Sequence, residues 1–102
     1  MAGYLDGKVA LVFGRGDDTH RGVAVALAQA GADIAVTGMK SDLAAEAALH
    51  SISNEIWALG RRSTVVTLTT DVDSTFAASA EAVRSELGHV DFVVRATTLP
   101  NS

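Results

Sequence analysis

The sequence predicts an α/β fold in which a doubly wound parallel sheet of four strands, in the order 3-2-1-4, carries helices on both faces. Two observations predict it. Short apolar runs of strand length alternate along the chain with helical patterns of ten or more residues. Crossover connections of this kind are right-handed, which makes the strands parallel and reverses their order between the first and the fourth. The 102 residues contain no repeat and no linker, so we expect one half-size domain over 1–102.

Two pairs of a strand and a helix occupy the first sixty residues, and each predicted element is closed by a glycine. The run 8–13 is continuously apolar, as expected of a strand that is buried on both faces. Apolar residues recur at helical spacing over 19–30, and a β-branched run follows at 33–37. A long second helix is predicted over 41–59, with Ser41 as its cap and a buried stripe that ends at Leu59.

The remaining residues repeat the pattern. The β-branched content of 62–68 predicts a third strand, and the polar stretch 69–74 leads into a third helix, which Gly88 ends. Residues 91–95 form the predicted fourth strand, and 96–102 form an extended loop. The carboxyl ends of the first and fourth strands flank the switch point of such a sheet, where ligands of this fold class bind.

Composition excludes several classes of function. The chain has no cysteine and a net charge of −4, so a disulfide framework, a thiolate metal site and a basic surface for nucleic acid are all excluded. It has no apolar run of ~20 residues and no signal peptide pattern, so we expect a cytoplasmic protein with no membrane partner. His20, His50 and His89 are too far apart in this topology for a metal site, and we expect them to be solvated or to cap helices.

The order and spacing of several short motifs resemble the amino-terminal half of a short-chain dehydrogenase/reductase. The residues that carry the resemblance are 5–12, Gly14, 28–36, 58–60, Asp71-Val72 and 87–91. The resemblance implies a Rossmann-type fold that binds NAD or NADP. It also implies hydride transfer between the nicotinamide cofactor and a carbonyl, alcohol or enoyl substrate. In that family the catalytic Ser and the Tyr-x-x-x-Lys pair follow the fourth strand, so we predict no catalytic residue within these 102 residues and no activity of this truncated domain alone.

The glycine motif of the family is degraded in this chain. An ungapped alignment places Gly14, Asp18 and His20 where the family has three glycines, which bring backbone amides close to the pyrophosphate. Asp17 and Asp18 add negative charge where phosphates arrive. At ~5 Å and an effective dielectric constant of ~20, each repulsion is about 3 kcal/mol before screening, against a helix-dipole gain of about 1 kcal/mol.

Two interpretations of this loop remain open. In the first, Asp18 or Thr19 serves only as the cap of the first helix, a position that both residue types favour. Alternatively, the loop resembles the divergent branch of enoyl-acyl-carrier-protein reductases, in which Gly22 replaces a displaced glycine of the motif.

The resemblance also assigns contacts at three further strand ends. Asp71 and Val72 take the place of the pair that holds the adenine ring, and 38–40 stands where an acid binds the ribose. Because Lys40 favours NADP and Asp17 favours NAD, the choice between these cofactors stays open. Arg95, in place of an asparagine, either pairs with Asp17 or Asp18 or neutralises a phosphate. The predicted cofactor-binding residues are Gly14, Gly16, Asp17, Thr19, Gly38, Met39, Asp71, Val72, Arg95 and Ala96.

The predicted fourth strand leaves an open sheet edge. Residues 91–95 are rich in Phe and Val, and such an edge is a template for pairing with another strand. We therefore expect a homo-oligomer, or a missing carboxyl-terminal half, to pair through this strand. Two functions follow: the NAD(P)-binding half of an oxidoreductase, or a non-catalytic Rossmann-like scaffold or assembly module that has lost cofactor binding.

Overall fold

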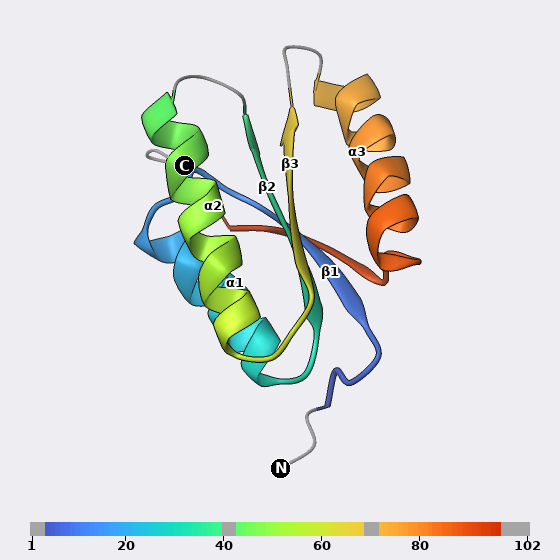
Figure 1. The fold of residues 1–102 in the computed structure, drawn as a ribbon. Helices are drawn as coiled ribbons and strands as arrows, with labels where there is room; N and C mark the ends of the chain where they lie inside the picture. Colours follow the sequence, from blue (N-terminus) through green and yellow to red (C-terminus); the bar gives the residue numbers. More distant parts are fainter. Residues whose placement is uncertain (1–3, 40–42, 69–71, 97–102) are drawn as a thin grey trace.

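The structure, a computed structural model, describes residues 4–39, 43–68 and 72–96. Strands and helices alternate through these segments, as the sequence predicts (Figure 1). The elements are β1 (Val9–Phe13), α1 (Asp18–Gln29), β2 (Asp33–Met39), α2 (Leu43–Ala58), β3 (Ser63–Leu68), α3 (Val72–Leu87) and β4 (Phe92–Arg95). The strands are all parallel in the order β3-β2-β1-β4, which confirms the predicted doubly wound sheet.

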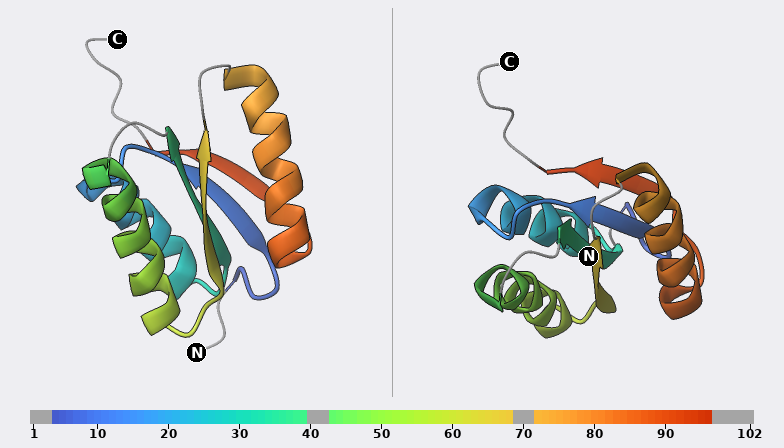
Figure 2. Two further views of the ribbon diagram at one scale, coloured as in Figure 1. Left: turned by 45° about the horizontal axis from the view of Figure 1, so that its top comes forward. Right: turned by 90° about the horizontal axis from the view of Figure 1, so that it is seen from above.

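The sheet is covered on both faces. Helices α1 and α2 lie together on one face, and α3 lies on the other (Figure 2). Successive residues of β1 point to opposite faces: Val12 packs in the cluster beneath α1 and α2, whereas Leu11 packs with Val83 and Leu87 of α3. Leu11 and Val12 are both fully buried, which explains why the strand sequence is continuously apolar rather than alternating.

Several boundaries differ from the sequence prediction by one to a few residues. Strand β2 continues through Gly38 and Met39 because both residues pair with β3. Helix α2 ends at Ala58, so Leu59 lies beyond it and is 42% exposed instead of extending the buried stripe. Helix α3 already begins at Val72. The expected cap Ser41 lies outside the described residues.

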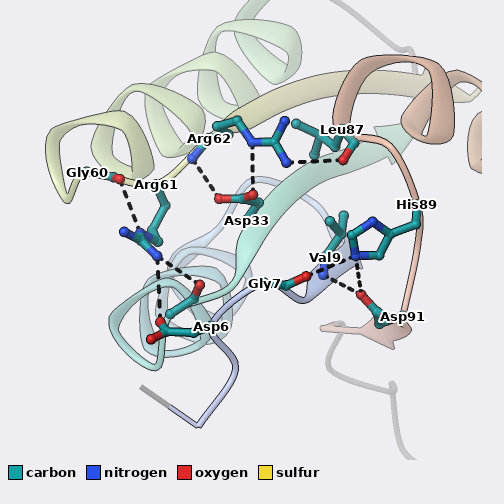
Figure 3. A network of polar contacts seen from close by, with 11 residues as sticks. Asp6, Gly7, Val9, Asp33, Gly60, Arg61, Arg62, Leu87, His89 and Asp91 are labelled. Atoms are coloured by element: carbon teal, nitrogen blue, oxygen red, sulfur yellow. Dashed lines mark hydrogen bonds and ion pairs between the residues drawn. The ribbon is translucent and has the colours of Figure 1, made fainter. Parts of the chain in front are cut away.

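A network of polar contacts ties the elements together at the amino ends of the strands (Figure 3). The Arg62 guanidinium donates from Nε to Asp33 Oδ2 (3.0 Å) and from Nη2 to the Leu87 carbonyl (3.1 Å), which joins β2, β3 and α3. Asp91 Oδ2 accepts from the Val9 amide at 2.8 Å and fixes the start of β4 beside β1. This edge is opposite to the carboxyl ends of the strands, so its charged residues hold the fold.

None of the helices in the described segments is long and apolar enough to cross a membrane.

Candidate functional site

The candidate site lies where β1 and β4 end. The two strands stay in register to Phe13 and Arg95, and the Ala96 amide donates to the Phe13 carbonyl at 2.7 Å. Ala96 is buried in the core cluster beneath α1 and α2. The loop 14–17 leads directly from β1 into α1. The structure therefore brings the β1–α1 loop and the end of β4 together at the switch point.

Two glycines allow the ends of β1 and β2 to approach closely. The Gly14 amide donates to the Thr37 carbonyl at 2.9 Å. A Cβ on Gly38 would lie 2.9 Å from the Gly14 carbonyl oxygen and 3.0 Å from Leu49 Cδ1. The position where the family pattern has a ribose-binding acid is thus filled by backbone and Leu49, and a side chain there requires these groups to shift.

His20 fills the space beside Gly14. The His20 side chain is fully buried, and a Cβ on Gly14 would lie only 2.4 Å from its Cγ. Its Nδ1 faces the Gly16 amide at 3.0 Å, and its Nε2 faces the Val12 carbonyl at 2.8 Å. Because the amide is a donor and the carbonyl an acceptor, the ring is the neutral tautomer with its proton on Nε2.

This buried role corrects the expectation that His20 is solvated or caps the helix. Burial lowers the pKa of His20, and this effect exceeds the opposite influences of the Val12 carbonyl and of Asp17. Sequence reasoning did not include His20 among the site residues. The available signal was its position, because His20 stands where the family has the third glycine, which permits close packing of the helix on the strand.

Asp17 caps α1, one residue before the expected Asp18 or Thr19. Its backbone is extended, its Oδ1 accepts from the His20 amide at 3.0 Å, and its carbonyl accepts from the Arg21 amide at 2.9 Å. Asp18 and Thr19 are exposed in the first turn. A carboxylate at this position satisfies one helix-terminal amide and places negative charge at the positive end of the helix dipole.

The predicted ion pair between Arg95 and the loop acids is not formed. Within the described part of the chain, Arg95 is exposed and makes no salt bridge with Asp17 or Asp18. The predicted adenine contact Asp71 lies outside the described residues, as does Lys40, the residue that favours NADP. The backbone of Val72 is described as the first residue of α3.

The loop can accept an anionic group through backbone donors that its own side chains do not use. Asp17 and His20 occupy the amides of His20 and Gly16, whereas the amides of Asp18 and Thr19 have no hydrogen-bond partner among the described residues. These two amides at the amino terminus of α1 are donors for an anionic group, and the carboxylates of Asp17 and Asp18 would oppose its charge. No group of three or more His, Asp or Glu side chains within the described segments is placed to hold a metal ion.

The sheet order and the β1–α1 loop at its switch point define a Rossmann-type α/β domain. No family model matches the sequence, and neither does any curated protein. Solved structures of short-chain dehydrogenases, in contrast, match most of it.

Three of these structures illustrate the similarity. A hydroxysteroid dehydrogenase from Escherichia coli is 29% identical with a TM-score of 0.72, over 89% of this chain and 37% of that one. A short-chain type dehydrogenase/reductase from Mycobacterium marinum is 30% identical with a TM-score of 0.72, over 87% of this chain and 34% of that one. Carveol dehydrogenase from Mycobacterium avium, in complex with NAD, is 26% identical with a TM-score of 0.77, over 90% of this chain and 36% of that one.

The chain thus spans about a third of the length of the structures it matches, a share consistent with their amino-terminal part. These structures confirm its resemblance to the amino-terminal part of short-chain dehydrogenases/reductases.

Proposed function

We propose that this chain is the NAD(P)-binding part of an oxidoreductase of the short-chain dehydrogenase/reductase type. The observation that carries the proposal is the position of the α1 amino terminus at the carboxyl end of β1, at the switch point of a 3-2-1-4 sheet. Two of the similar structures, carveol dehydrogenase from Mycobacterium avium and a xylitol dehydrogenase, hold NAD. Their likeness to this chain supports the same class of ligand here.

The amides of Asp18 and Thr19 would hold the pyrophosphate. Gly14 and Gly16 belong to the same loop, but the space left by their missing side chains is filled by His20 and Ala48. The adenosine would lie over the ends of β2 and β3, near Gly38, Met39, Asp71 and Val72, and the nicotinamide near Arg95 and Ala96. When bound, the cofactor supplies hydride chemistry for a carbonyl, alcohol or enoyl substrate. The choice between NAD and NADP rests on the ribose position, where Gly38 offers no carboxylate.

Titration of the chain with NAD⁺ and NADP⁺ tests the proposal, with binding followed by calorimetry and by chemical shifts of the Thr19 and Gly38 amides. Saturable binding that shifts these amides supports it. The exposed pair Arg84 and Glu81 on α3 provides a control, because R84A should leave the affinity unchanged. Absence of binding at millimolar nucleotide, with the protein folded, contradicts it.

A second candidate function is a Rossmann-like scaffold or assembly module without cofactor. One observation favours it: Asp17 and His20 already engage two amides of the loop in which the family binds phosphate. The same titration separates the two functions. A scaffold would show no nucleotide-dependent shift at any amide of the loop and would keep its stability unchanged as nucleotide is added.

We also propose that the free edge of β4 pairs with a further strand, from a second copy or from a carboxyl-terminal continuation. Val93 is 61% exposed and Phe92 39% exposed, although both belong to a strand of the sheet. Apolar side chains on an unpaired edge favour association. Light scattering of the 102-residue chain tests this: association that V93K reduces supports the proposal, and a well-folded monomer of this chain contradicts it.

A further inference from the structure

We propose that His20 is a positioning residue: its neutral imidazole holds the β1–α1 loop in the conformation needed for nucleotide, and protonation releases the loop and weakens binding. The part of this proposal that concerns nucleotide affinity rests on the proposed function. The part that concerns the loop does not, because it follows from contacts within the chain.

The ring joins three consecutive parts of the site. Its own backbone belongs to the first turn of α1, its Nε2 donates to the Val12 carbonyl of β1 at 2.8 Å, and its Nδ1 accepts from the Gly16 amide at 3.0 Å. Gly14 has no side chain and leaves room for the ring, as the 2.4 Å approach of a built Cβ shows. A single buried side chain therefore fixes the end of the strand, the loop and the start of the helix relative to one another.

Both ring nitrogens are used, and in opposite senses. A second proton would go to Nδ1, where it would face the N–H of Gly16 at a separation suited to a hydrogen bond. Two donors would then point at each other, the Gly16 amide would lose its acceptor, and a cation would be buried. The neutral ring satisfies all these groups, so we expect its protonation to disturb the conformation of the loop.

The charged groups around the ring do not compensate for that proton. Asp17, in the loop, favours the charged form, but burial outweighs it and keeps the pKa of His20 below its usual value. β1 faces the ring with the Val12 carbonyl and Gly14, which carry no charge. From α2, the carboxylate of Glu55 is already engaged by Arg21 at 2.6 Å.

Two substitutions divide the role of the ring. In His20→Asn the side-chain oxygen lies near the place of Nδ1 and can accept from Gly16, and it does not titrate. In His20→Gln the amide nitrogen can reach toward the Val12 carbonyl, but the bond to Gly16 is lost. His50→Gln is the matched control, since His50 is exposed on α2.

The loop is tested without ligand by following the His20 ring nitrogens and the Gly16 amide by NMR from pH 8 to pH 4.5. In the wild-type chain and in H50Q we expect the ring and the Gly16 amide to change with one common midpoint below pH 6.5. In H20N the Gly16 amide should stay constant over this range. The proposal is overturned if the ring protonates while Gly16 does not respond, or if the ring stays neutral throughout.

Nucleotide affinity tests the functional part. Below the midpoint, the binding-competent fraction falls about tenfold per pH unit, so the wild-type Kd for NAD⁺ should rise by the same factor. H20N should bind with a Kd that varies less than about twofold over the range, and H20Q should bind weakly at every pH. A wild-type Kd that is independent of pH overturns the functional part. If no variant binds nucleotide at any pH, the proposed function fails, while the Gly16 measurement still decides the role of His20.

Discussion

Arg62 provides a direct test of how the amino edge of the sheet is held together. R62A removes the bonds from Nε to Asp33 Oδ2 (3.0 Å) and from Nη2 to the Leu87 carbonyl (3.1 Å) but keeps the backbone bond from residue 62 to Asp33. The Arg62 side chain is 53% exposed and that of Asp33 is 17% exposed. Each charged bond is thus partly screened and contributes about 1 kcal/mol, and the entropy recovered by the freed side chain offsets part of the sum.

We therefore expect R62A to lower the free energy of unfolding by about 1.5 kcal/mol, measured by urea denaturation, and to lower Tm by roughly 6–12 °C. R84A is the matched control. Arg84 also pairs with a carboxylate, that of Glu81, but both side chains are exposed on one helix, so its loss should cost less than about 0.5 kcal/mol. If the two variants lose equal stability, the contacts of Arg62 with Asp33 and Leu87 do not hold this edge.

Three other predictions concern the loop and the strand end beside it. Asp17→Ala should lower the free energy of unfolding, measured with urea, by about 1 kcal/mol because it removes the cap of α1. Asp18→Asn should change this free energy by less than about 0.5 kcal/mol and should tighten NAD⁺ binding severalfold at low salt. Gly38→Asp should cost about 1–3 kcal/mol, because its Cβ meets the Gly14 carbonyl at 2.9 Å, and calorimetry should show no gain in NAD⁺ affinity. Because burial lowers the pKa of His20 in the folded state, the folded chain binds fewer protons than the unfolded chain below pH 6.5. Stability should therefore fall as the pH drops below 6.5, by up to about 1.4 kcal/mol per pH unit, and H20N should abolish this dependence.

The fold follows closely from the sequence because its signals are local and agree with one another. The apolar run of β1, the helical spacing in α1 and the glycines after each helix fix the elements, and right-handed crossovers then fix the order of strands. Where boundaries moved, tertiary contacts decided them. Gly38 and Met39 lie in β2 because β3 continues alongside, which no local pattern in 33–37 reveals.

The site was less predictable because neighbouring residues have the same local chemistry, and tertiary contacts decide which of them takes a given role. Asp17 and Asp18 have the same cap chemistry, and only the extended backbone at position 17 makes it the cap. Convergence of the loop with the end of β4 was predicted correctly, but the ion pair of Arg95 was not, since its side chain is exposed. His20 looks polar in sequence, and its burial depends on a carbonyl in β1 and on a glycine six residues earlier.

The altered glycine motif therefore does not by itself decide whether the loop binds phosphate. The two residues that replace glycines differ in burial. His20 is buried and accepts a hydrogen bond from the Gly16 amide, whereas Asp18 is exposed in the first turn of α1. The first change is structural and leaves the amides of Asp18 and Thr19 in place. The second change adds negative charge at the helix terminus, and salt or the substitution Asp18→Asn would reduce its repulsion of a phosphate. If the chain binds a dinucleotide as proposed, its phosphates would therefore rely on the amides of Asp18 and Thr19 at the amino terminus of α1, and the charge of Asp18 would oppose them there.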